Sequence, residues 1–164
     1  MKSFVSLLIL LTIITLFGCA HIVSDELRQK AYGEPPAYAL FKDPDSYKGR
    51  IVILGGVIIS STNTKEGTYI EVLQKPLDYR GRPEDTDISF GRFIVLYEGY
   101  LDTAVYSQGR EITVAGEVIG KTFRPLNEIQ YPYLLIKSKE IHLLEARYNL
   151  PLHFGIGIGV WHAF

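Results

Sequence analysis

Five runs of apolar, largely β-branched residues, each bounded by turn signals, restrict this chain to a small β fold. Runs of this composition favour strands, because branched side chains pack well on a pleated surface. The polar stretches between them carry the glycine, proline, asparagine and aspartate residues that turns require. The fifth run is the longest and is long enough to serve two sheets. The predicted strands cover residues 50–60, 68–74, 92–98, 110–120 and 133–145.

Glycines inside the strands predict bends that suit a closed barrel. Gly55 and Gly56 interrupt the first run, which indicates a bulge or a sharp bend there. The stretch DPDSYKGRIVILGGVI (43–58) is similar to DTAVYSQGREITVAGEVI (102–119), so two strands bend at matching places. In the second stretch, Asp102 is a candidate cap for a turn or short helix. We predict a mainly β fold, a small five-stranded OB-like barrel with a short helix between the third and fourth strands. A seven-stranded sandwich is the alternative.

The N-terminus has the layout of a secretory signal. Lys2 is followed by an uncharged run of 14 residues, FVSLLILLTIITLF (4–17). As a helix this run is about 21 Å long, short of the roughly 30 Å hydrocarbon core of a bilayer, so a spanning helix is the weaker interpretation. A positive start, a short apolar middle and a small residue before the cut are typical of a cleaved signal peptide.

The single cysteine of the chain directly follows this run. Leu16-Phe17-Gly18-Cys19 resembles the bacterial lipobox. The resemblance implies that the Cys19 sulfur takes a diacylglyceryl group and that a dedicated peptidase cuts between Gly18 and Cys19. With two or three acyl chains, at about 0.8 kcal/mol per methylene, such an anchor is practically permanent. Ala20 is similar to the residue found in lipoproteins sorted to the outer membrane. The alternative is an ordinary signal peptide with a chance cysteine.

These signals divide the chain into four parts. A signal peptide (1–18) precedes a lipidated tether (19–40), in which Pro35-Pro36 stiffens the chain and excludes helix. We expect at most a short helical turn within the tether, near residues 24–30. The barrel covers 41–146, and a tail rich in glycine, isoleucine and aromatic residues covers 147–164.

The barrel region resembles the Slp family of outer-membrane lipoproteins, which is named for starvation or stationary-phase induction. The resemblance covers about residues 41–145 and implies a Gram-negative envelope, lipid anchoring and an outer-membrane address. It implies no reaction. The matching pieces are YKGRIVILGGVI, QKPLDYRGRPE, GRFIV, LDTAVYSQGREITVAGEVIG and YPYLLIKSKEIHL.

The loop between the second and third strands is the best candidate for a binding site. Arginine forks bind carboxylate or phosphate groups, and aromatic rings stack on sugars. This combination favours an anionic glycan, a peptide or a partner protein as the ligand. The alternative is a solvated loop in which neighbouring charges neutralise one another. The candidate residues are Tyr79, Arg80, Arg82, Asp85, Asp87 and Arg92.

Catalysis, metal binding and nucleic-acid binding have little support. The histidines (21, 142, 153 and 162) show no metal-ligand spacing, and no nucleophile or phosphate-loop motif occurs. We therefore expect no enzyme activity, no metal and no cofactor, although Asp85 and Asp87 leave an envelope hydrolase as a remote alternative. Loss of residues 1–18 takes one lysine from 17 basic residues, against 18 acidic, for a net charge of about −2. That balance argues against a nucleic-acid partner.

The tail alternates glycine with branched apolar residues at 155–160, followed by Trp161 and Phe164. An extended segment of this kind shows glycine on one face and apolar groups on the other. Two interpretations remain open, packing on the barrel itself or contact with a partner or a membrane interface.

Together, these features predict an outer-membrane lipoprotein that is lipid-anchored on the periplasmic face. We expect a non-enzymatic structural or binding role in the cell envelope under starvation or stress. The expected contacts are the membrane, through the anchor, and an envelope protein or glycan. The alternatives are an accessory subunit of an envelope protein complex and, less favoured, an envelope hydrolase.

Cys19→Ser is expected to leave an uncleaved precursor without acyl label, because a hydroxyl cannot form the thioether. Metabolic labelling with a radioactive fatty acid, together with the mass of the N-terminal peptide, measures this. A lipid-free mature protein of normal size from this variant would contradict the lipobox interpretation.

Overall fold

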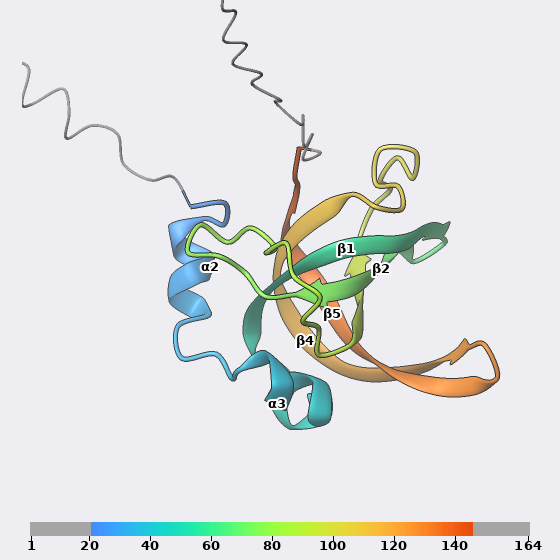
Figure 1. Ribbon diagram of the computed structural model, residues 1–164, viewed down its shortest axis with the longest axis horizontal. Coiled ribbons are helices and arrows are strands. Elements are labelled where there is room, and N and C mark those ends of the chain that lie inside the picture. Colours follow the sequence, from blue (N-terminus) through green and yellow to red (C-terminus); the bar gives the residue numbers. More distant parts are fainter. Residues whose placement is uncertain (1–20, 146–164) are drawn as a thin grey trace, which may run out of the picture.

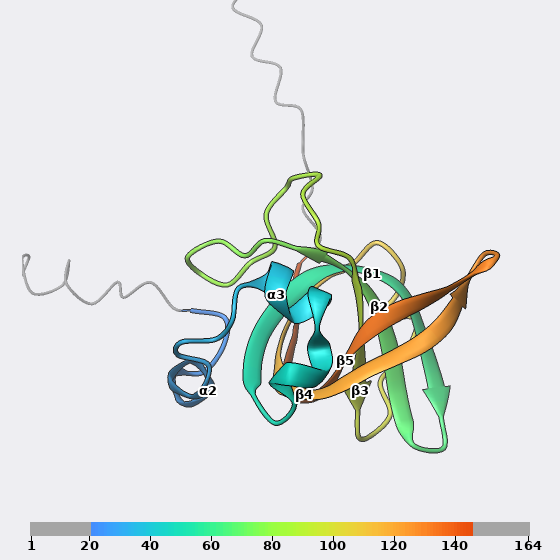
Figure 2. The ribbon, with the colours of Figure 1, turned by 90° about the horizontal axis from the view of Figure 1, so that it is seen from below.

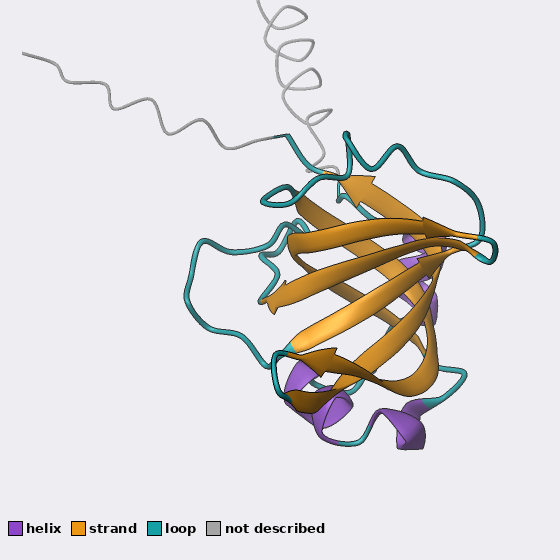
Figure 3. Ribbon diagram, turned by 90° about the vertical axis from the view of Figure 1, so that its right-hand side faces the viewer, coloured by secondary structure: helices purple, strands orange, loops and turns teal. Residues whose placement is uncertain are grey.

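The computed structural model describes residues 21–145, which form a closed five-stranded barrel (Figure 1). The strands follow one another around the barrel in the order β1-β2-β3-β5-β4 and wrap around one interior (Figure 3). This is the OB-type order, so the predicted fold is confirmed. The strands are β1 (Ile51–Thr64), β2 (Gly67–Lys75), β3 (Arg92–Tyr97), β4 (Glu111–Leu126) and β5 (Ile129–Leu143). The helices are α2 (Asp25–Lys30), α3 (Ala37–Lys42) and the 3-10 helix η1 (Pro44–Tyr47).

Several predictions concern residues outside this range. The signal peptide, the lipidation and cleavage positions Gly18 and Cys19, and the tail 147–164 all lie outside the described residues. These assignments, and the division of the chain into four parts, stay predictions.

The barrel closes through one parallel pair of strands. β3 runs parallel to β5, with Phe93 opposite Leu134, whereas the other pairs are antiparallel. β1 pairs with β4 in its first half and with β2 in its second half. The two pairings overlap at Gly55–Val57, where β1 has a strand on each side.

Glycines allow the strands to come this close. A Cβ atom on Gly56 would overlap the carbonyl group of Leu73 on β2. One on Gly116 would lie 2.6 Å from the carbonyl oxygen of Lys137, at a place where the β4–β5 register shifts. The β1–β2 register shift lies between Ile58 and Ser60, not at the glycine pair. The glycines of β1 therefore serve a close backbone approach, and the bulge expected there falls a few residues later.

The interior is filled by branched aliphatic side chains and one aromatic ring, Phe93. Each fully buried side chain of this size contributes about 1.5 to 3 kcal/mol relative to its exposed state. Leu40 of α3 belongs to the same cluster, and Phe41 meets Phe93 edge-on with ring centroids 6.4 Å apart. α3 therefore closes one side of the core (Figure 2).

The segment predicted as a tether packs on the barrel from residue 21 onward. Val23, Ala31 and Leu40 are all at least 95% buried. α2 matches the expected helical turn, but α3 was not expected. Pro36 does not exclude it, because this proline is the N-cap residue and the helix begins after it. One apolar residue is buried near the start, one in the middle and one at the end of the segment. These contacts explain why the segment packs on the barrel and is not a free tether.

A long hairpin extends β4 and β5 into residues 121–132, between the fourth and fifth predicted strands. β4 and β5 pair out to Leu126 opposite Ile129, and Asn127 takes the positive φ of 55° that a two-residue turn needs. The hairpin contains Pro125 and Pro132. In this part of the hairpin each strand has a partner on one side only, so a proline without an N–H is tolerated there.

The expected short helix between β3 and β4 is a single capped turn. The Asp102 carboxylate accepts the Ala104 N–H at 2.8 Å, and the Asp102 carbonyl accepts the Tyr106 N–H at 2.9 Å. The turn does not extend, because the Gly109 N–H already donates to the Ile58 carbonyl of β1 at 2.9 Å.

Gly56→Ala is expected to destabilise the protein far more than Gly109→Ala. At Gly56 the methyl group meets the fixed carbonyl of Leu73, and such overpacking costs about 3 kcal/mol. At Gly109 the space is open, and the positive φ of 85° alone costs about 1 kcal/mol. Thermal unfolding of both variants, followed by circular dichroism, measures the difference. Equal melting temperatures would contradict the close β1–β2 approach.

Candidate functional site

The turn at residues 78–82 presents three of the six predicted site residues. The Asp78 carboxylate accepts the backbone N–H groups of Arg80 and Arg82, both at 2.8 Å. The bond from Arg82 is the main reason why the pKa of Asp78 lies below its usual value. The Gly81 N–H donates to the Asp78 carbonyl at 2.9 Å, with Gly81 at φ +85°. The Asp78 carboxylate thus stabilises the turn through hydrogen bonds to its backbone.

This turn is fixed to the barrel and to the start of the described chain. The buried Thr113 hydroxyl donates to the Gly81 carbonyl at 2.6 Å, and the Ile22 N–H donates to the Arg80 carbonyl at 3.0 Å. Tyr79 is 73% exposed, and the Arg80 guanidinium lies over its ring, 5.3 Å from the centroid. The turn therefore holds an aromatic ring and a cation outward on a rigid base.

The second part of the loop, residues 84–91, is held by two side chains of β2. The Gln74 side-chain oxygen accepts the Phe90 N–H at 2.9 Å, and the Lys75 ammonium group donates to the Thr86 carbonyl. Asp85 and Asp87 are exposed on this part. The loop therefore does not bring these two acids together with Arg92.

Arg92 belongs to a different surface, the outer face of β2, β3 and β5. Its guanidinium donates to Glu71 at 2.7 Å, and the Tyr133 hydroxyl donates to the same carboxylate oxygen at 3.0 Å. Glu71 raises the pKa of Arg92. Burial, and after it Glu71, raises the pKa of Tyr133. The six predicted residues are therefore divided among three places: the turn 78–82, the second part of the loop and the outer face of the barrel.

The β4–β5 hairpin covers part of this outer face. Ile94 lies between the inward-facing Phe93 and Val95, so it faces outward, yet it is fully buried. The Arg124 guanidinium of the hairpin lies 5.1 Å from the Tyr69 ring centroid on β2. The strand-alternation pattern places Tyr69 and Glu71 outward, but the sequence does not reveal that the hairpin reaches them.

An apolar groove lies between α3 and the loop and was not predicted. Its volume is about 430 Å³. Tyr38 and Phe90 stand at its side, with ring centroids 6.5 Å apart, and are 60% and 46% exposed. Ile88 on the same loop is also exposed. The apolar lining comes from Pro35, Pro36, Ala37, Leu40, Ile53, Leu54, Pro76, Leu77 and Phe90. The one sequence feature that could have indicated this groove is the pair of aromatic residues in PPAYALF (35–41).

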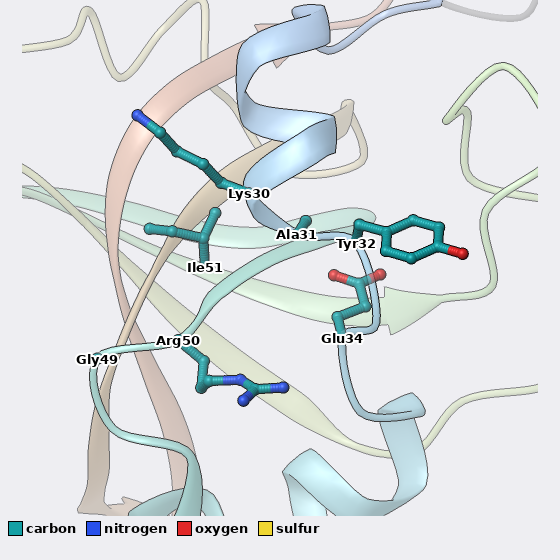
Figure 4. Close-up of a pocket in the computed structure, with 7 residues that line it drawn as sticks. All are labelled: Lys30, Ala31, Tyr32, Glu34, Gly49, Arg50 and Ile51. Atoms are coloured by element: carbon teal, nitrogen blue, oxygen red, sulfur yellow. The ribbon is translucent and has the colours of Figure 1, made fainter.

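A second pocket, of about 400 Å³, lies between the end of α2 and the start of β1 (Figure 4). Its charged groups have partners within the protein. Glu34 accepts the Ile53 N–H at 2.8 Å, Arg50 donates to the Gly33 carbonyl at 3.3 Å, and Lys30 pairs with Glu26 at 2.6 Å. Figure 4 shows Lys30 directed away from Glu34 and Arg50. This pocket is therefore a weaker candidate.

A serine, a glutamate and a histidine lie together at β5, but their hydrogen bonds do not connect them as nucleophilic catalysis requires. The residues are Ser24, Glu140 and His142. The Ser24 hydroxyl donates to Glu140 at 2.7 Å, and His142 bonds to the same carboxylate. A catalytic hydroxyl must bond to the histidine instead. The three residues thus form a clamp that holds the start of α2 on β5.

Two further features bear on function. Within residues 21–145, no three side chains of His, Cys, Asp or Glu are grouped so as to hold a metal ion. The helices of the same range lack the length and apolarity that a bilayer crossing needs.

Comparison with known proteins connects the chain to one family. Residues 16–154 match the profile of the Outer membrane lipoprotein Slp family. An uncharacterized protein of Haemophilus influenzae is 29% identical over 105 residues, which are 62% of this chain and 57% of that protein. The uncharacterized lipoprotein YeaY of Escherichia coli is 27% identical over 94 residues, which are 57% of this chain and 48% of that protein. The chain thus spans about half the length of these relatives.

Among solved structures, a small single-stranded DNA-binding protein from Streptomyces coelicolor is similar. The match covers 58% of this chain and 94% of that one, with a TM-score of 0.36 and 12% identity.

Acid is expected to weaken the Ser24–Glu140 clamp. Burial raises the pKa of Glu140, but the hydrogen bonds from Ser24 and His142 together outweigh it and lower the pKa below its usual value. A carboxylate with a lowered pKa stabilises the fold above its unfolded pKa, and this stabilisation is lost as the pH falls through the folded pKa. Glu140→Gln should therefore lower the melting temperature at pH 7 and have less effect near pH 3. An equal effect at both pH values would contradict this role.

Proposed function

Because the chain belongs to the Slp family of outer membrane lipoproteins, we propose that it acts as a non-enzymatic binding module of the cell envelope. In this proposal, acyl chains on Cys19 hold it at the periplasmic face of the outer membrane. The barrel takes part there in an assembly with another envelope protein, as an accessory subunit, under starvation or stress.

The observation that carries this proposal is the apolar groove between α3 and the loop. Phe90 lines this groove, the Tyr38 ring lies 6.5 Å from the Phe90 ring, and both side chains leave large apolar surfaces in solvent. Grouped exposed apolar side chains of this kind are typical of interaction sites, because burying them in a partner is favourable.

The chemistry of the groove favours a protein segment over a glycan. The polar side chains along it are already used within the protein, since Gln74 binds Phe90 and Lys75 binds Thr86. Sugar recognition needs side chains that offer hydrogen bonds to many hydroxyl groups. An apolar side chain of a partner protein needs only the hydrophobic lining.

A nucleic-acid partner has less support. The mature chain carries a small net negative charge, whereas phosphate backbones are bound by basic surfaces. The outer face of β2 and β3 is engaged by Arg124 and Tyr133 of the protein itself.

A photo-crosslinking amino acid at position 90 is expected to capture an envelope protein in intact cells. Phe123, 58% exposed on the β4–β5 hairpin, is the matched control position and should give no such product. Mass spectrometry identifies the captured protein. Tyr38→Ser should reduce the product, because it removes one side of the apolar surface.

The result also separates the alternatives. Glycan products at position 90 would favour a cell-wall binder instead. Equal products at both positions, or no effect of Tyr38→Ser, would overturn the groove as the contact surface.

A further inference from the structure

The start of the described chain lies directly on the turn 78–82. The Ile22 N–H donates to the Arg80 carbonyl at 3.0 Å. The His21 ring covers Gly81 so closely that a Cβ there would lie 2.9 Å from the ring. Figures 1 and 2 both show this turn beside the first residues of the described chain.

The chain between this contact and the expected anchor is very short. Cys19 precedes Ile22 by three residues, and one residue spans at most about 3.6 Å. The Cα atom of Cys19 is therefore within about 11 Å of that of Ile22, whatever path the chain takes.

The maximum distance between Cys19 and Ile22 also limits the distance between the turn 78–82 and a bilayer that holds the acyl chains. Acyl chains on Cys19 lie in the hydrocarbon, so the cysteine itself lies at the level of the headgroups. The headgroup region adds about 5 to 7 Å on each side of the hydrocarbon core. A turn within reach of Cys19 therefore lies among the headgroups or directly above them.

We propose that the turn 78–82 is a membrane contact surface. Tyr79 inserts between the lipid headgroups of the leaflet that holds the anchor, and Arg80 binds their phosphate groups. The inference rests on the proposed function, because it requires the acyl chains on Cys19.

The chemistry of the turn suits this surface. A tyrosine presents an apolar ring and a polar tip, which is why it concentrates at membrane interfaces. The arginine fork binds phosphate with two parallel hydrogen bonds. The carboxylate of the turn, Asp78, accepts backbone N–H groups within the turn.

The neighbouring helix does not oppose the contact by its charge. α2 carries two acids, and each has a basic partner one turn later. Asp25 pairs with Arg28, and Glu26 pairs with Lys30. The four charges are therefore paired within the helix.

The experiment uses the lipidated protein in vesicles of phosphatidylethanolamine with a minor fraction of phosphatidylglycerol. The single tryptophan is removed by Trp161→Phe, and Tyr79→Trp then provides a fluorescent reporter in the turn. Phe123→Trp in the same background is the matched control, since Phe123 is exposed on the hairpin. Circular dichroism verifies that both variants fold.

The reporter at position 79 is expected to emit at shorter wavelength than the reporter at position 123 in the same vesicles, because the headgroup region is less polar than water. Its emission should be quenched when the vesicles carry lipids brominated just below the headgroup, whereas the emission at position 123 should stay unchanged. Adding Arg80→Gln to the Tyr79→Trp protein should weaken the quenching, because the phosphate contact is removed.

Two failures are distinguishable by the mass of the N-terminal peptide. An acylated Cys19 with an unquenched reporter at position 79, or with equal quenching at positions 79 and 123, would overturn this inference alone. A Cys19 without acyl groups would overturn the proposed function, and the inference with it.

Discussion

The double pairing of β1 is the constraint on which the rest of the structure depends. At Gly55–Val57 the strand is hydrogen-bonded to β2 on one side and to β4 on the other, and the parallel β3–β5 pair joins the far edges of these two pairings into a closed barrel. A side chain at Gly56 would collide with Leu73 and separate the two strands. The enclosed core, the cover provided by α3 and the position of the loop after β2 all follow from this closure.

The fold could be predicted because its signals are local. β-branched runs and glycines at matching positions specify strands and bends without knowledge of their neighbours. The parts that escaped prediction depend on distant contacts. The segment 21–40 looks polar, but its few apolar residues, such as Val23 and Leu40, find covered places on the barrel. The residues 121–132 were not predicted as strand, and their prolines are tolerated because each strand of the hairpin has a partner on one side only.

The candidate site shows the same limit. Closeness in sequence suggested that Arg80, Arg82 and Arg92 act together. In the structure Arg92 begins β3, and its side chain donates to Glu71 and not to the turn that holds Arg80 and Arg82. The groove beside Phe90 needed α3, which lies some 50 residues away in the sequence and was expected to be part of a tether. Sequence patterns identify residues suited to binding, but the partners of each side chain depend on the closed barrel.

The clamp between Ser24 and Glu140 joins positions 116 residues apart, and this separation sets an order in time. Synthesis produces the chain from its N-terminus, so Ser24 is present long before β5 is. Until β5 has emerged and paired with β3 and β4, the start of α2 has no place to dock. The segment before β1 therefore stays undocked while the strands of the barrel are still being completed. It becomes part of the folded surface only when the last strand completes the barrel.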